Sequence, residues 1–200
     1  IDNFIIFVRN SKDLKELDLS STNISPTQLS RIIEAINENQ EIKIFSLHLN
    51  NLGLKDGKIK TVFKSLSDKS NHMKWKALSL ENNGLSCKDF NLLIQILGTL
   101  PNLTTLNIGM NFDDKTKDIE QYLPNVLTLP RLEKLSLRGS KEKCLTVRII
   151  SAFVAALIKS NKTLRLNLRD NKLGDQGYSL LKDAIDAHKL IELQIDGNKP

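Results

Sequence analysis

The sequence has few of the residues that build disulfide-bonded, metal-binding or membrane-spanning proteins. Its 200 residues include two cysteines, three histidines and five prolines, and aromatic residues make up only 5%. Cys87 and Cys144 form no CxxC pair and have no histidine at ligand spacing, so we expect neither a disulfide nor a metal site. No apolar run approaches about 18 residues, and the first residues do not resemble a signal peptide. We therefore expect a cytoplasmic protein.

The sequence also lacks the residue patterns of an active site. His48, His72 and His188 stand without carboxylates at the spacing of a catalytic triad or a metal site. We expect a non-enzymatic protein with no cofactor and no metal ion.

The charge is basic but dispersed. A formal net charge of +6 and a pI near 9.3 would permit an acidic partner, a nucleic acid or an anionic membrane surface. Lysine and arginine are spread along the chain and form no block, so we expect protein partners and no nucleic acid.

One pattern organises the chain. Residues 75–85, WKALSLENNGL, fit L-x-x-L-x-L-x-x-N-x-L, the signature of a leucine-rich repeat. Leu78 and Leu80 point inward between polar neighbours, which predicts a half-buried strand. Asn83 is expected to pair with backbone groups where the coil turns, and Trp75 is expected to pack in the core.

The pattern recurs seven times. We place the asparagine position at residues Thr22, Asn50, Asn83, Asn111, Ser140, Asn171 and Asn198, which lie 27 to 33 residues apart and close to 29 on average. A repeat of this length has room for a full helix outside each strand. The sequence therefore predicts an α/β leucine-rich repeat solenoid: a right-handed horseshoe with parallel strands on the concave face and helices on the convex face.

The whole chain is expected to form a single leucine-rich repeat domain. Residues 1–13 fit the closing helix of a preceding repeat, and neither end carries a polar cap. Since residue 1 is also not methionine, we expect residues 1–200 to be part of a longer array.

Repeat two fits the pattern, whereas repeats four and six depart from it. In repeat two we take Phe45 and Leu47 as inward and Asn50 as the asparagine position. Repeat four has Asp113 where an aliphatic residue belongs, so its closure is expected to be distorted. Pro124 is expected to kink or restart the helix that follows. Repeat six has Thr163 in its first leucine position.

The concave face carries the candidate site. Lys134, Arg138, Arg165 and Arg169 are expected to cluster on adjacent strands about 4.8 Å apart. Glu81, Glu192 and Asp196 are expected to flank them, and His48 to lie on the same face. Either an acidic segment of a protein neutralises this cluster, or the flanking acids do and the surface is simply solvated.

The repeat type resembles the ribonuclease-inhibitor-like class of leucine-rich repeats. Within it the chain is most similar to the CARMIL family, the capping protein, Arp complex and myosin I linkers. The similarity is carried by the order of LKELDLSSTNIS, PNLTTLNIGMNFDDK, LPRLEKLSLRGSK, NKTLRLNLRDNKLGDQGYSLLKDAI and LIELQIDGNKP, with GMNFDD the most specific piece.

The CARMIL resemblance implies a cytoplasmic scaffold that regulates actin filament assembly and binds protein partners, cytoskeletal proteins among them. It implies membrane contact only through domains outside this segment, and it leaves a dimer open. Two alternatives remain: a GTPase activator of the Ran GTPase-activating type, and the sensing array of an immune receptor or a pathogen effector.

Overall fold

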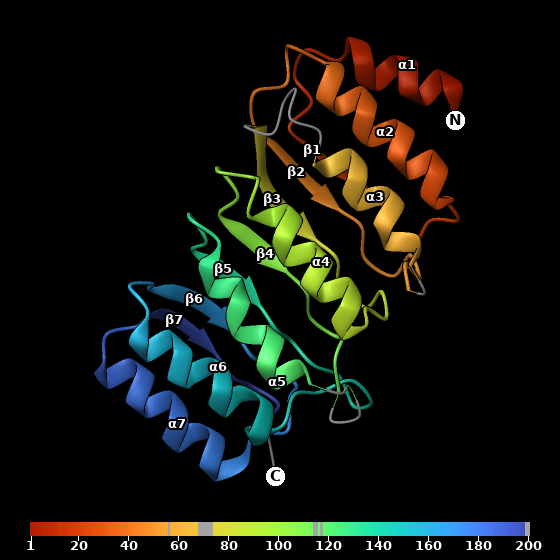
Figure 1. Cartoon of the computed structure of the whole chain (residues 1–200). Helices are drawn as coiled ribbons and strands as arrows, with labels where there is room; N and C mark the ends of the chain where they lie inside the picture. Colours follow the sequence, from red (N-terminus) through yellow and green to blue (C-terminus); the bar gives the residue numbers. More distant parts are fainter. Residues whose placement is uncertain (56, 68–73, 114–115, 117, 199–200) are drawn as a thin grey trace.

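The computed structural model describes residues 1–198 apart from 56, 68–73, 114–115 and 117 (Figure 1). The strands are β1 (Glu16–Asp18), β2 (Phe45–His48), β3 (Trp75–Ser79), β4 (Thr105–Asn107), β5 (Lys134–Ser136), β6 (Leu164–Asn167) and β7 (Leu190–Gln194). The helices are α1 (Asp2–Asn10), α2 (Pro26–Glu38), α3 (Lys58–Leu66), α4 (Cys87–Leu97), α5 (Ile119–Tyr122), the 3-10 helix η2 (Leu123–Thr128), α6 (Val147–Lys159) and α7 (Gly174–Asp186).

The strands form one open parallel sheet in chain order, β1 to β7, and the helices lie along one side of it (Figure 1). Neighbouring strands stack about 4.8 Å apart, whereas packed helices need about 8–10 Å, so the sheet side is the concave one. The register aligns Leu47, Leu78 and Leu106, which are all buried against the helices. The predicted α/β solenoid is confirmed.

Local sequence signals set the helix ends. Ser25 caps α2: its hydroxyl accepts from the Gln28 N–H at 3.2 Å, and the Gln28 side chain accepts from the Ser25 N–H at 2.9 Å. Pro26 fits the first turn because its missing N–H would have no helical partner there. The preceding α1 also matches the closing helix expected within residues 1–13.

The asparagine positions form a buried ladder between repeats. The Asn83 amide donates to the carbonyls of Leu49 and Leu80 at 2.8 and 2.9 Å, and its oxygen accepts from the Leu52 N–H at 3.0 Å. Asn111 and Asn171 repeat this arrangement. The predicted role of the asparagine is confirmed, because each amide ties its own turn to the preceding repeat.

The predicted register of repeat two is wrong by two residues. Leu47 pairs with Leu78, which places Leu47 and Leu49 inward and Leu52 at the asparagine position, not Asn50. Leu52 lies 30 residues after Thr22 (52 − 22) and 31 before Asn83. A shift of two residues keeps the same side chains inward, so the alternation alone could not reveal the error.

Repeat four closes with an aromatic residue. Phe112 is buried and packs edge-on against Phe90 with ring centroids 5.3 Å apart, so Asp113 does not have to fill the core. The restart expected at Pro124 is confirmed, since α5 ends at Tyr122 and η2 begins at Leu123. In repeat six Leu164, not Thr163, is buried at the start of the strand.

Trp75 fills the core as predicted: it is 1% exposed and meets the Phe45 ring edge-on at 5.9 Å. Beside it, the Lys74 ammonium donates to the carbonyls of Ile36, Asn37 and Asn39 at 2.8, 3.1 and 2.9 Å. These carbonyls lie at the end of α2, where helical partners run out, so Lys74 caps the helix across the repeat boundary.

Both ends of the stack expose apolar side chains. Phe7 on α1 is 57% exposed, and Ile191 on β7 is 62% exposed. Ile6 and Ile185 are also exposed at the two ends. In the middle of the stack the corresponding faces are covered by the neighbouring repeat.

Candidate functional site

The observed register defines three columns of outward side chains on the concave face. The first column holds Glu16, Ser46, Ala77, Thr105, Lys134, Arg165 and Glu192. The second holds Asp18, His48, Ser79, Asn107, Ser136, Asn167 and Gln194. The third, just after the strands, includes Glu81, Gly109, Arg138, Arg169 and Asp196, which backbone hydrogen bonds keep in step.

The four predicted cations lie on or just after the neighbouring strands β5 and β6, but two of them are already neutralised. Arg138 pairs with Asp170 at 2.9 Å, and Arg169 pairs with Asp196 at 3.0 Å. Each arginine therefore uses the acid of the next repeat, and the third column is close to neutral. Asp196 is one of the acids expected to flank the cations, whereas Asp170 is not.

The other two cations, Lys134 and Arg165, are direct register partners on β5 and β6. Arg165 reaches the Glu192 carboxylate only at 3.7 Å, and Glu192 also accepts from Gln194 at 2.8 Å. No carboxylate of the described residues forms an ion pair with Lys134. The first column therefore keeps an excess positive charge at these two neighbours.

Lys134 and Arg165 line a shallow hollow of about 270 Å³ over β4–β7, which we call the concave hollow. Its walls also include Thr105, Asn107, Ser136, Asn167, Glu192 and Gln194. The Asn167 oxygen accepts from the Arg169 N–H at 3.0 Å, and within the described part of the chain its NH₂ group has no acceptor. The hollow thus combines two cations with amide and hydroxyl donors, a set that binds a carboxylate.

His48 and Glu81 lie outside this hollow. The corrected register moves His48 to the second column on β2, where its Nε2 lies 3.1 Å from the Glu16 carboxylate. The Glu81 carboxylate accepts from the Asn107 amide at 2.8 Å, and Gly109 separates it from Arg138. Neither residue is brought to the cation cluster, so the candidate site contracts to the β5–β7 side.

The sequence pattern missed Asp170 as a partner. Asp170 follows β6 in the left-handed conformation, with φ of 57°, and this turn brings its carboxylate to Arg138. The turn lies outside the strand columns from which the site was predicted. Asn167 and Gln194 were in those columns, but only the hollow distinguishes them from the other small polar residues.

Three further observations concern metal binding, cysteine reactivity and helix length. The described residues hold no group of three or more His, Cys, Asp or Glu side chains able to bind a metal ion. Burial raises the pKa of the Cys87 thiol, which disfavours the reactive thiolate, and no disulfide joins it to Cys144. Over the same residues no helix has the length and apolarity to span a membrane.

No protein-family model matches the chain. Over 180 residues it is 23% identical to the human protein "Capping protein, Arp2/3 and myosin-I linker protein 3", and equally to the rat protein of that name. The alignment covers 90% of this chain, which spans only about 13% of the length of those curated relatives.

Among solved structures, the leucine-rich repeat-containing protein LegL7 of Legionella pneumophila superposes with a TM-score of 0.59 and 20% identity over 96% of this chain and 68% of that chain. The fold is a leucine-rich repeat solenoid. The tropomodulin C-terminal domain of Caenorhabditis elegans gives a TM-score of 0.47 at 17% identity, over 94% of this chain and 92% of that one.

Proposed function

We propose that the protein is a non-enzymatic interaction scaffold whose concave hollow binds an acidic segment of a partner protein. The observation that carries this proposal is the pair Lys134 and Arg165, adjacent in register and lining a hollow with few competing acids. Two cations about 4.8 Å apart suit one carboxylate between them, or two carboxylates on alternate residues of an extended segment.

The segment would run across the strands. Glu192 already approaches Arg165 from β7, so an incoming carboxylate takes the place of a weak contact at 3.7 Å and does not break a close ion pair. By contrast, Arg138 and Arg169 would have to release acids held at 2.9 and 3.0 Å. Binding therefore depends on Lys134 and Arg165 more than on the two paired arginines.

The leading biological context is regulation of actin filament assembly in the cytoplasm. It is supported by the 23% identity to a capping protein, Arp2/3 and myosin-I linker protein along 90% of this chain. Purified capping protein and Arp2/3 complex are the first partners to assay. Failure of both to bind would remove this context but leave the acidic-segment proposal standing.

The exposed apolar ends support a second proposal, that further repeats cover them. Phe7 and Ile191 would become buried in a longer array, as their counterparts within the stack are. Extending the chain by its natural flanking residues should raise the melting temperature. An unchanged melting temperature together with unchanged exposure of these ends would contradict the proposal.

Charge reversal tests the hollow. We expect the double variant Lys134→Glu and Arg165→Glu to abolish binding of a fluorescein-labelled peptide of alternating Asp and Gly, measured by anisotropy at low salt. The matched control, Lys12→Glu with Lys182→Glu, makes the same change in net charge at exposed sites on other surfaces. Equal losses in both variants, or binding retained by the hollow variant, would refute a specific site.

A further inference from the structure

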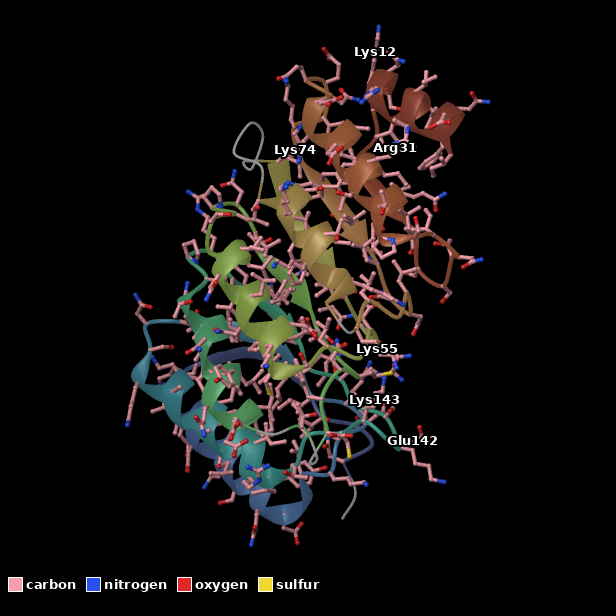
Figure 2. All side chains as sticks on the ribbon, turned by 45° about the vertical axis from the view of Figure 1, so that its right-hand side comes forward. Lys12, Arg31, Lys55, Lys74, Glu142 and Lys143 are labelled. Carbon is pink, nitrogen blue, oxygen red and sulfur yellow. The ribbon has the colours of Figure 1, made fainter. Side chains whose placement is uncertain are left out.

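A second basic surface lies on the edge where strands lead into helices. Lys55, Lys58, Lys60 and Lys88 are all exposed there, at the starts of α3 and α4, and we call these four residues the lysine rim. Lys60 and Lys88 line an open groove of about 560 Å³, whose wall includes Gly57 and Gly84. In Figure 2, Lys55 projects on this side of the molecule, away from Lys74.

The rim is made of lysines, whereas the ion pairs of the helical layer are formed by arginines. Arg9 pairs with Glu38 at 2.8 Å and Arg31 with Asp2 at 2.6 Å, which neutralises the α1–α2 surface. Arg148 pairs in the same way with Glu120. No ion pair joins a rim lysine to any carboxylate that the structure describes.

Few acids lie beside the rim, although Asp118 lines a neighbouring hollow together with Lys88. Residues 55–64 contain four lysines against one aspartate, even with Asp56 counted from the sequence. Nearby Asp89 is committed to the α4 cap, since its carboxylate accepts from the Ser86 N–H at 3.0 Å and the Ser86 hydroxyl at 2.7 Å. The cluster therefore attracts an anionic partner over a Debye length of about 8–10 Å.

The residue types indicate what kind of partner this is. The rim has lysine but no arginine, and no aromatic residue lines its groove. Stable protein interfaces are enriched in arginine and aromatic anchors and depleted in lysine, and single-stranded nucleic acid is bound with stacking aromatic side chains that the rim groove lacks. Lysine ammonium groups instead act as point charges, which suits a diffuse layer of anionic headgroups.

We propose that the lysine rim docks the protein on the surface of an anionic phospholipid bilayer. This differs from the expectation that membrane contact resides only outside the segment. The large exposed apolar side chains among the described residues lie elsewhere, so attachment is electrostatic and does not insert into the lipid. The concave hollow is on the other layer and stays open to its partner.

The expected strength follows from the number of lysines. Each lysine near an anionic surface strengthens binding about fivefold, so four give a factor on the order of 10² to 10³. Binding of this kind weakens steeply as salt rises from about 50 to 200 mM. It orients the protein at a membrane and does not by itself anchor it there.

Vesicle sedimentation of the full chain tests the proposal. We expect binding to vesicles of phosphatidylcholine with about 30% phosphatidylserine, and none to phosphatidylcholine alone. Replacing the four rim lysines with glutamine should reduce binding on the order of 10²-fold or more. The control replaces Lys12, Lys15, Lys76 and Lys182 with glutamine, an equal change in net charge at exposed lysines elsewhere.

Three outcomes would overturn the proposal: equal losses in both quadruple variants, no binding to the phosphatidylserine vesicles at low salt, or tight binding to duplex DNA that the vesicles fail to compete. The Lys134→Glu and Arg165→Glu variant separates the two surfaces. This variant should retain most vesicle binding, so a loss of peptide binding at the concave hollow can be distinguished from a loss of vesicle binding at the lysine rim.

Discussion

Replacing Lys74 with methionine should destabilise the protein more than any other change to a lysine of the described chain. The side chain is 4% exposed, and its ammonium is the donor to three carbonyls at the end of α2. Methionine preserves much of the volume and the apolar stem but donates no hydrogen bond. The three carbonyls then remain buried without this partner.

The magnitude follows from the number of bonds and from what offsets them. A hydrogen bond with a charged partner contributes about 1.5–3 kcal/mol, and an unsatisfied buried acceptor costs about 1–3 kcal/mol. Part of this gain is cancelled in the wild type because the ammonium itself is desolvated. We therefore expect a loss of about 2–4 kcal/mol, which lowers the melting temperature by roughly 4–16 °C for a chain of this size.

Thermal unfolding followed by circular dichroism at pH 7 measures the effect. The control is Lys76→Met, two residues further along on β3, where the side chain is exposed and the melting temperature should change little. If Lys74→Met were as stable as Lys76→Met, the ammonium would not be holding the helix end, and the proposed capping across repeats would be wrong.

Three further predictions can be checked by the same assay. Burial, and then the charge of a neighbouring lysine, lower the pKa of Lys74 to about 8 from 10.5, so the folded chain releases this proton first as pH rises. The unfolded state then binds more protons than the folded state between about pH 8 and 10.5. The free energy of unfolding of the wild type relative to Lys74→Met should therefore grow over that range and stay constant below it. A constant difference in free energy between the two proteins up to pH 10 would contradict the lowered pKa. Gly139→Ala should cost about 1–3 kcal/mol because its Cβ would lie 2.3 Å from a backbone oxygen of the next repeat, whereas Gly98→Ala, with contacts of 3.4 Å, should be tolerated. Asn83→Ala should lower the free energy of unfolding by about 2–3 kcal/mol because the hydrogen bonds of the asparagine ladder are lost, whereas Asn23→Ala, at an exposed site, should change it very little. Equal melting temperatures for Gly139→Ala and Gly98→Ala, or for Asn83→Ala and Asn23→Ala, would refute the argument for that pair.

Most of the fold could be predicted because each repeat carries the same local residue pattern. Inward leucines, a turn asparagine and an apolar helix stripe recur, and Pro124 marks the point where α5 gives way to the 3-10 helix η2. The predicted register of repeat two was wrong because Asn50 and Asn51 stand close to the asparagine position, which Leu52 occupies in the structure. The inward alternation is identical in both registers, and only pairing with the next strand distinguishes them.

The candidate site was predictable in position but not in charge. The positions of Lys134 and Arg165 follow from strand periodicity, and the structure brings them together. Which cations remain available depends on side chains from turns, such as Asp170, and no periodicity places those. Lys74 was missed for a related reason, since its acceptors lie 35 to 38 residues earlier in the chain.

The backbone around Asp170 decides which cation of the concave face stays available. A Cβ at Gly139 would lie 2.3 Å from the Asp170 carbonyl oxygen, and one at Gly197 would lie 2.4 Å from the carboxylate. The absence of side chains at these two glycines leaves room for the Asp170 turn, and the turn delivers its carboxylate to Arg138. Lys134 has no acid placed for it in this way. The positive charge of the concave hollow is therefore a consequence of where the solenoid can and cannot fit an acidic turn.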